Sequence, residues 1–321
     1  MKRMLLLFYL AVWMAACAPA PTPEPTVTPE PTLIPTPEAT MTPEPIMETT
    51  FQPEGLKDPY GIAVNSLGQI YISDAGNERI LVLDADGNLI ATWDSKGSGE
   101  GEFNTFGFGG LAIDSNDNVF VVDNGNHRIQ KFDPDGGFLA QWGNEGKGNG
   151  QFVRAIGIAV DKEGNVYVTD DGNPFVQKFD NDGHFLMRFG GEGEAEGQFS
   201  HATGIAVDGQ GNIFVADYEN KRVQKFDPEG KFLKVWGMGG DVGITGIPEA
   251  LVVDGQGNVY VSDYLLGRMQ VFDNDGNFLW ALGGKHLAEN PFQRPTGIAF
   301  DAQGRILIVN QVGNSISVLR R

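Results

Sequence analysis

Five side chains able to bind a ligand interrupt an otherwise regular pattern beside repeated glycines. They are Tyr60, Arg154, His201, Glu249 and Arg294. Carboxylate, imidazole, guanidinium and phenol groups form directional hydrogen bonds and ion pairs, and side chains carried on loops of a rigid scaffold commonly form binding sites. These five residues are therefore our candidates for ligand binding.

Local catalytic motifs are absent from the sequence. There is no His-x-x-x-His pair, no Gly-x-Ser-x-Gly elbow and no phosphate-binding loop. The single cysteine, Cys17, excludes an intramolecular disulfide and a cysteine-rich zinc cluster. A zinc site assembled from His127, His201 and His286 is an alternative that needs distant loops to converge, with His184 on the opposite face.

Acidic turns superficially resemble calcium loops. Asp133-Pro-Asp-Gly, Asp180-Asn-Asp-Gly and Asp273-Asn-Asp-Gly have glycine in fourth place, whereas the EF-hand requires it in sixth place and a glutamate in twelfth. We expect tight turns in which the first aspartate accepts backbone hydrogen bonds and the glycine takes a positive φ.

An internal repeat sets the positions of the five candidate binding residues along the chain. Gly61, Gly110, Gly157, Gly204, Ala250 and Gly297 begin six units, with spacings of 49, 47, 47, 46 and 47 residues. Each unit holds short runs rich in Val, Ile and Phe, separated by Gly-Asn or Asp-Gly turns, which is typical of an antiparallel meander. Stacking such sheets radially buries both faces and leaves only short edges. The repeat therefore predicts an all-β, six-bladed β-propeller of four-stranded antiparallel blades.

Aspartate and arginine recur within the units. Asp74, Asp123, Asp170, Asp217 and Asp263 end the second strands, and Arg79, Arg128, Arg222 and Arg268 begin most of the third strands. A catalytic carboxylate is needed once, so residues repeated in each blade are interpreted as scaffold pairs. The pattern lapses at Phe175 and at Asn310 with Ser315.

The repeated motif resembles the NHL repeat family. It is clearest in Thr203-Gly-Ile-Ala-Val-Asp208, Gly211-Asn-Ile-Phe-Val-Ala-Asp217 and Asn220-Lys-Arg-Val-Gln-Lys-Phe-Asp227. The resemblance extends from about residue 55 to the end, and it implies that the strands run from the central channel outward.

The metal-binding positions of two related classes of propeller enzyme can be compared with this sequence. Peptide-amidating lyases are NHL-like propellers whose zinc-binding histidines immediately precede the inner-strand glycine. The matching residues here contain no histidine: Tyr60, Gly109, Ile156, Thr203, Glu249 and Thr296. Gluconolactonase-like propellers use Glu, Asn and Asp around a channel metal, and Glu249 is the one acidic residue in this set. A metal-dependent hydrolase or lyase of gluconolactonase type is therefore the alternative function.

The last unit stops after its third strand, Ser315 to Leu319, and needs a fourth. We expect residues 49–56, with Phe51 pointing inward, to supply that outer strand and close the ring.

The amino terminus has the features of a lipoprotein signal. Lys2 and Arg3 precede an apolar stretch from Met4 to Met14, which is too short to span a bilayer as a helix. The run Met14-Ala-Ala-Cys17 resembles the bacterial lipobox, with Met14 in place of the usual leucine. We expect residues 1–16 to be a signal peptide and Cys17 to carry the lipid.

Residues 17–48 are rich in Pro, Thr and Glu and have no apolar periodicity. Such a segment cannot bury enough surface to offset its ordering entropy, and its prolines favour polyproline II. We expect a disordered stalk with a reach on the order of 100 Å, followed by the propeller at residues 49–321.

The formal net charge of −19 argues against binding nucleic acid, which requires Lys and Arg against phosphates. The favoured hypothesis is an exported binding or scaffold module. It would be anchored to the membrane by lipid alone, would face the extracytoplasmic side, and would bind a protein, a peptide or a cell-wall glycan without a cofactor. This resembles the extracellular NHL sensor domains of some bacterial kinases.

Overall fold

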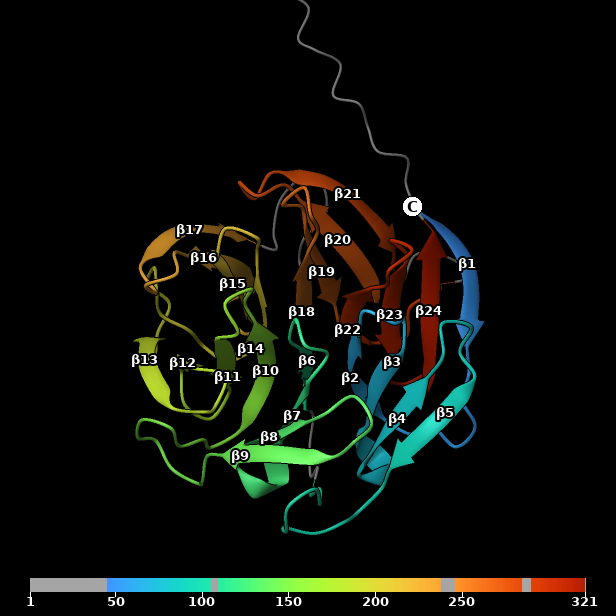
Figure 1. The fold of residues 1–321 in the computed structure, drawn as a ribbon. Coiled ribbons are helices and arrows are strands. Elements are labelled where there is room, and N and C mark those ends of the chain that lie inside the picture. The colour runs from blue at the N-terminus through green and yellow to red at the C-terminus, as the bar shows by residue number, and fades with distance from the viewer. Residues whose placement is uncertain (1–44, 105–108, 238–245, 285–289, 321) are drawn as a thin grey trace, which may run out of the picture. The chain divides into compact units, whose positions relative to one another are not determined.

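The computed structural model describes residues 45–104, 109–237, 246–284 and 290–320. Six four-stranded antiparallel sheets surround a central channel (Figure 1). The innermost strand of each sheet contacts the innermost strands of its two neighbours, so the ring is closed. The predicted six-bladed β-propeller is confirmed.

Each of the first three blades has four strands, which are ordered from the channel outward. They are β2 (Pro59–Val64), β3 (Ile70–Asp74), β4 (Arg79–Leu83) and β5 (Leu89–Trp93); β6 (Leu111–Ile113), β7 (Val119–Asp123), β8 (Arg128–Phe132) and β9 (Phe138–Trp142); and β10 (Ala155–Val160), β11 (Val166–Asp170), β12 (Phe175–Phe179) and β13 (Phe185–Gly190).

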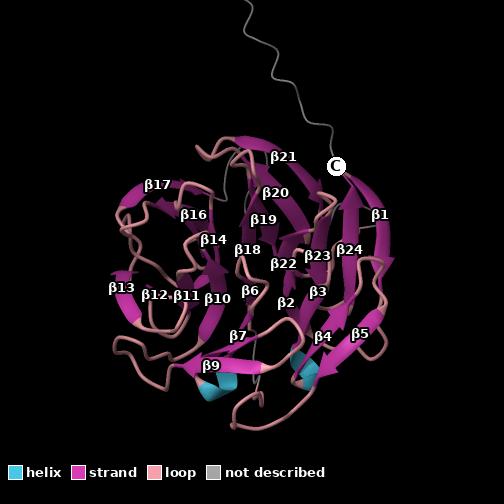
Figure 2. Ribbon diagram, in the orientation of Figure 1, coloured by secondary structure: helices cyan, strands magenta, loops and turns pink. Residues whose placement is uncertain are grey.

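The other three blades follow the same order. They are β14 (Ala202–Val207), β15 (Ile213–Asp217), β16 (Arg222–Phe226) and β17 (Phe232–Gly237); β18 (Pro248–Val253), β19 (Val259–Asp263), β20 (Arg268–Phe272) and β21 (Phe278–Gly283); and β22 (Pro295–Phe300), β23 (Ile306–Asn310), β24 (Ser315–Arg320) and β1 (Ile46–Phe51). Two short 3-10 helices, η1 (Ala75–Asn77) and η2 (Asn124–Asn126), are the helices of the described residues (Figure 2). No helix among those residues is long and apolar enough to cross a membrane.

Burial explains the sequence of each strand. The second strand of every blade is buried along its whole length, and it consists largely of β-branched and aromatic residues that pack on both sheet faces. The outer strand β9 instead alternates between half-buried and exposed residues, because one face meets solvent. The hydrophobic clusters combine residues from successive blades, so the core lies between the blades.

The acidic turns have the predicted geometry. Asp133 Oδ1 accepts hydrogen bonds from the backbone N–H groups of Asp135 (3.0 Å) and Gly137 (2.7 Å). Gly136 has a φ of +93°, which favours glycine. The turns beginning at Asp180 and Asp273 repeat these bonds. These motifs are therefore structural turns.

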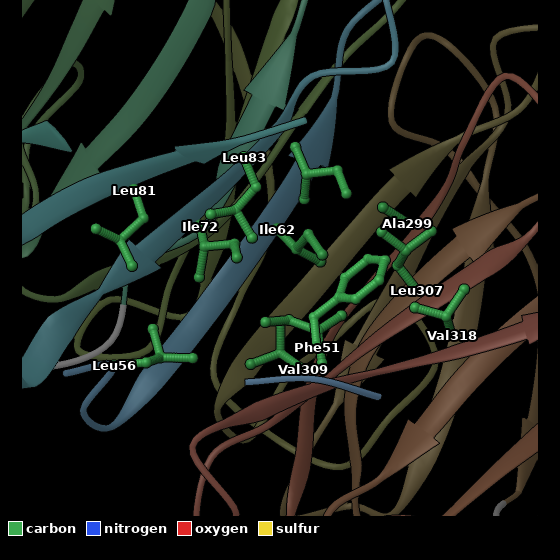
Figure 3. Close-up of a cluster of buried hydrophobic side chains, with 12 residues drawn as sticks. Phe51, Leu56, Ile62, Ile72, Leu81, Leu83, Ala299, Leu307, Val309 and Val318 are labelled. Atoms are coloured by element: carbon green, nitrogen blue, oxygen red, sulfur yellow. The ribbon is translucent and has the colours of Figure 1, made fainter. Parts of the chain in front are cut away.

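An amino-terminal strand closes the ring, as predicted, but it lies earlier in the chain than expected. Strand β1 (Ile46–Phe51) pairs antiparallel with β24, whereas the expected range was 49–56. Pro53, two residues after the last paired residue Phe51, has no backbone N–H to continue the pairing. Phe51 points into the core between the first and last blades, beside Val309 (Figure 3).

The recurring aspartate–arginine pairs lie within single blades. The Nε to Oδ2 distances are 2.5 Å for Arg79–Asp74, 2.8 Å for Arg128–Asp123, 2.7 Å for Arg222–Asp217 and 3.0 Å for Arg268–Asp263. All four carboxylates are buried. The interpretation of these residues as scaffold pairs is confirmed.

The two lapses in this pattern have different replacements. At the last blade a neutral network takes over, in which Asn310 Nδ2 donates to Ser317 Oγ at 2.8 Å. In the third blade the position of the missing arginine is taken by Phe175, and burial raises the pKa of Asp170. The Asp170 carboxylate keeps backbone N–H bonds from residues 153 and 154 at 2.7 and 2.8 Å, and a bond of this kind is also present in the blades that have the arginine.

Candidate functional site

A cavity of about 300 Å³ opens at one mouth of the central channel. We call it the central cavity. The loops that enter the inner strands and the loops between second and third strands meet on this face. The lining residues are Tyr60, Arg154, Ile156, Asp171, His201, Thr203, Tyr218, Glu249, Tyr264 and Gln311.

Most of the lining comes from two equivalent positions of the repeat. One position immediately precedes the inner-strand glycine or its equivalent, and it supplies Tyr60, Ile156, Thr203 and Glu249. The other follows the last residue of the second strand, and it supplies Asp171, Tyr218, Tyr264 and Gln311. The scaffold carboxylates join these loops: Asp170 binds the backbone N–H of Arg154 on one loop and of Gly172 on the other. The wall of the cavity is thus positioned by buried hydrogen bonds.

Glu249 and Tyr60 form the floor of the central cavity. The Tyr60 hydroxyl donates a hydrogen bond of 2.5 Å to Glu249 Oε1, and both side chains are buried. Burial raises the pKa of Glu249 to about 7. Burial, with the Glu249 charge adding to it, raises the pKa of Tyr60 well above its usual value. The pair can therefore hold a proton near neutral pH.

The same two residues separate the central cavity from a narrower space below. That space of about 70 Å³ is lined mainly by glycine and aliphatic residues of the six inner strands, and Tyr60 and Glu249 border it as well. The central cavity is thus the polar, wide end of the channel.

A charged cluster forms one wall. Arg154 Nη2 pairs with Asp171 Oδ2, and His201 Nδ1 lies 3.4 Å from Asp171 Oδ1. That second carboxylate oxygen is buried and makes no hydrogen bond within the described part of the chain. His201 has a φ of +64°, a left-handed backbone conformation that costs free energy in a non-glycine residue. Beside the cavity, Asp171 Oδ1 thus has the His201 ring as its neighbour but accepts no hydrogen bond from the described residues.

The wall beside this cluster is aromatic, and the Tyr218 backbone N–H donates to the His201 carbonyl oxygen at 2.9 Å. Tyr218 and Tyr264 are half-buried, and the Tyr264 hydroxyl donates to Gln311 Oε1 at 3.1 Å. Burial, then the nearby Glu249, raises the pKa of Tyr218. The Arg294 guanidinium lies over the Tyr264 ring, with its carbon 5.4 Å from the ring centre.

Four of the five predicted residues line the central cavity: Tyr60, Arg154, His201 and Glu249. Arg294 lies beside it, against Tyr264. Their binding role stays a prediction. Six lining residues were not among the binding candidates: Ile156 and Thr203 before the inner-strand glycines, and Asp171, Tyr218, Tyr264 and Gln311 after the second strands. The sequence does contain a sign of the residues that follow the second strands, because that position varies from blade to blade. The six residues at this position are Ala75, Asn124, Asp171, Tyr218, Tyr264 and Gln311.

The site does not supply an evident metal-ligand set. Within the described ranges, no group of three or more His, Cys, Asp or Glu side chains could hold a metal ion. His127 does not line the cavity, and its Nδ1 lies 3.0 Å from the carbonyl oxygen of Val153. His184 pairs with Asp180 in an exposed turn, and His286 lies outside the described residues. Among the lining residues, Glu249 is the carboxyl group whose pKa burial raises to about 7.

The NHL repeat family model matches residues 56–83, 109–132 and 199–226. The chain therefore contains NHL repeats, and they fold as a six-bladed β-propeller. No curated protein matches the sequence.

Many solved structures share this fold. A streptogramin B lyase is 15% identical with a TM-score of 0.59, covering 85% of this chain and 96% of its own. A gluconolactonase from Xanthomonas campestris is 19% identical with a TM-score of 0.60, covering 81% and 85%. A catalytically inactive virginiamycin B lyase from Staphylococcus aureus with quinupristin is 15% identical with a TM-score of 0.59, covering 85% and 83%. At these identities the likeness shows the fold alone.

Proposed function

We propose that this protein is a binding module that holds the end of a glycan in the central cavity. The observation that carries the proposal is that the non-repeated residues of several blades converge on one cavity. Residues that repeat in each blade form the scaffold, whereas residues that differ between blades gather around one cavity at one mouth of the channel. A scaffold alone does not require that gathering.

The chemistry of the wall favours a ligand rich in hydroxyl groups. Asp171 Oδ1 accepts no hydrogen bond within the described residues, where its nearest polar neighbour is the His201 ring nitrogen at 3.4 Å, and a buried acceptor left without a hydrogen bond costs about 1–3 kcal/mol. Arg154 supplies donors, and a hydroxyl group can donate and accept at once. The rings of Tyr218 and Tyr264 offer rigid faces for the apolar C–H faces of a sugar.

A glycan fits this cavity better than an extended peptide. Extended peptides usually pair with an open sheet edge, where backbone hydrogen bonds supply affinity. The open edges of these blades are their outer strands, such as β9 and β13, whereas the cavity lies at the inner strands. The cavity offers side chains rather than a backbone edge.

The proposal includes display from a membrane. A lipid on Cys17 and the Pro-rich segment 17–48 would hold the propeller on the order of 100 Å from the bilayer. The support for this part is the lipobox-like sequence and the composition of the segment. A signal from a bound glycan would then have to pass through a partner protein.

A glycan array tests the binding proposal. Full-length protein, purified in mild detergent, is labelled and applied to immobilised glycans. We expect binding to a subset of glycans that is lost in Asp171→Asn and Tyr218→Ala and retained in His184→Ala, because His184 lies in an exposed turn away from the cavity. Failure of the folded wild-type protein to bind any glycan would overturn the proposal.

Acid-assisted hydrolysis or elimination is the second candidate function, favoured by the raised pKa of Glu249. A buried carboxyl group that titrates near 7 inside a cavity is suited to proton transfer at neutral pH. The test is turnover of gluconolactone, with and without added divalent cations, in the wild type and in Glu249→Gln. A rate equal to spontaneous hydrolysis in all samples would remove this candidate for that substrate class.

A further inference from the structure

A second hollow of about 300 Å³ lies beside the central cavity. We call it the side pocket. It is formed by the loop between β19 and β20, residues 290–294 before β22, and the loop between β23 and β24. Its lining residues are Tyr264, Leu265, Gly267, Asn290, Phe292, Gln293, Arg294 and Val312. Tyr264 lines both hollows, so one ligand could contact both.

Two exposed apolar side chains border the side pocket. Leu265 is 44% exposed and Val312 is 56% exposed. The equivalent loop position holds glycine in the first three blades and Glu219 in the fourth. Among the described residues, these are the two large exposed hydrophobic residues in the loops between second and third strands. Since the other blades form without an apolar residue there, the fold does not require this exposed surface, and a bound apolar group would cover it.

An unpaired cation completes the side pocket. The exposed Arg294 guanidinium lies over the Tyr264 ring, and its Nη1 is 3.4 Å from the Tyr264 hydroxyl. It forms no ion pair with any carboxylate of the described residues, although the chain carries 42 acidic side chains against 23 basic ones. Arginine binds a carboxylate through charge-assisted, often bidentate hydrogen bonds.

We infer that the side pocket binds the carboxyl end of a peptide, with an apolar side chain against Leu265 and Val312 and the terminal carboxylate on Arg294. The inference rests on the proposed function, since the same ligand would place a glycan in the central cavity. The ligand class that fits both hollows is a glycopeptide with a free carboxyl end and an apolar last residue.

The direct test uses a small probe that carries only the side-pocket chemistry. N-acetyl-L-leucine and N-acetyl-L-leucine amide are titrated into the full-length protein and followed by ligand-observed NMR. We expect the acid to bind with a Kd on the order of 1 mM, as befits a small fragment. The amide should bind roughly tenfold more weakly because it lacks the charge for Arg294.

Variants separate the two contacts. Arg294→Gln should weaken the acid about tenfold and leave the amide unchanged. Leu265→Ser should weaken both probes by several-fold, because it removes apolar contact. Arg188→Gln is the matched control, since Arg188 also lies over an aromatic ring (4.4 Å from Phe175) but sits on the outer strand β13. Leu233→Ser, which changes an outer-strand leucine that is 46% exposed, controls for Leu265→Ser.

The outcomes distinguish this inference from the proposed function. Binding of N-acetyl-L-leucine together with a blank glycan array would keep the side pocket and remove the glycan from the central cavity. Glycan binding with no measurable N-acetyl-L-leucine binding would overturn the side pocket alone. Equal affinity for the acid and the amide would also overturn it, because Arg294 would then recognise no carboxylate. Thermal melts of each variant establish that it is folded.

Discussion

Replacing Glu249 with glutamine should change how the stability of the propeller depends on pH. Burial raises the pKa of Glu249 from 4.5 to about 7 in the folded protein. The folded state therefore keeps the proton between these values while the unfolded chain loses it. Stability contributed by protonated Glu249 is present at low pH, falls as the pH rises above about 4.5, and is fully lost above about 7.

The magnitude follows from the size of the shift. Each pKa unit corresponds to about 1.4 kcal/mol, so the full loss is about 3 kcal/mol, most of it between about pH 4.5 and pH 7. Glutamine resembles the protonated carboxyl group and can still accept the hydrogen bond from the Tyr60 hydroxyl. We therefore expect Glu249→Gln to melt at a temperature similar to wild type at pH 5 and on the order of 5–10 °C higher at pH 8.

The assay is thermal unfolding of both proteins, followed by circular dichroism across this pH range. Glu219→Gln is the matched control because Glu219 lies at the same mouth but is exposed, and we expect its melting profile to follow that of wild type. Tyr60→Phe removes a hydrogen bond that lowers the pKa of Glu249, so the pH midpoint should move upward. Parallel profiles for wild type and Glu249→Gln would refute the reasoning about burial of this carboxyl group.

Two further predictions concern the ring-closing strand β1 and the expected lipid anchor at Cys17. Phe51→Ala should cost about 3–5 kcal/mol by leaving a cavity between the first and last blades, and should lower the melting temperature by roughly 10 °C. Met47→Ala on the same strand, where the side chain is 40% exposed, should change it little, and an equal drop in both variants would argue against closure through Phe51. Cys17→Ser should move the protein from the membrane fraction to the soluble exported fraction in a bacterial host, as measured by fractionation and blotting. Unchanged membrane association would count against the lipid anchor.

The fold could be predicted from the sequence because each blade repeats the same pattern of short apolar strands and tight turns. Regular spacing from Gly61 to Gly297 fixed the number of blades, and the missing fourth strand of the last blade required a strand from the amino terminus. The bounds of that strand were less predictable, because Ile46 and Met47 are exposed and follow a Pro-rich segment without apolar alternation. Backbone pairing with β24, rather than burial, holds its first residues.

The candidate site was partly predictable for the same reason. Four lining residues could be found because they break the pattern near the inner-strand glycines. Asp171 and Tyr264 follow the second strands, where the residue type varies from blade to blade, so no repeated pattern marks them. The hydrogen bond between Tyr60 and Glu249 joins residues 189 positions apart. It depends on how the two side chains meet across the closed ring, which the repeat pattern does not specify.

Calorimetric titration with the strongest ligand from the glycan array tests the central claim most directly. The account predicts one site per chain in wild type and in His184→Ala, with affinity at least tenfold weaker in Asp171→Asn and Tyr218→Ala, because those two side chains line the central cavity. Equal affinity in all four proteins, with each variant folded, would place binding elsewhere and contradict the claim that the cavity at the channel mouth is the functional site.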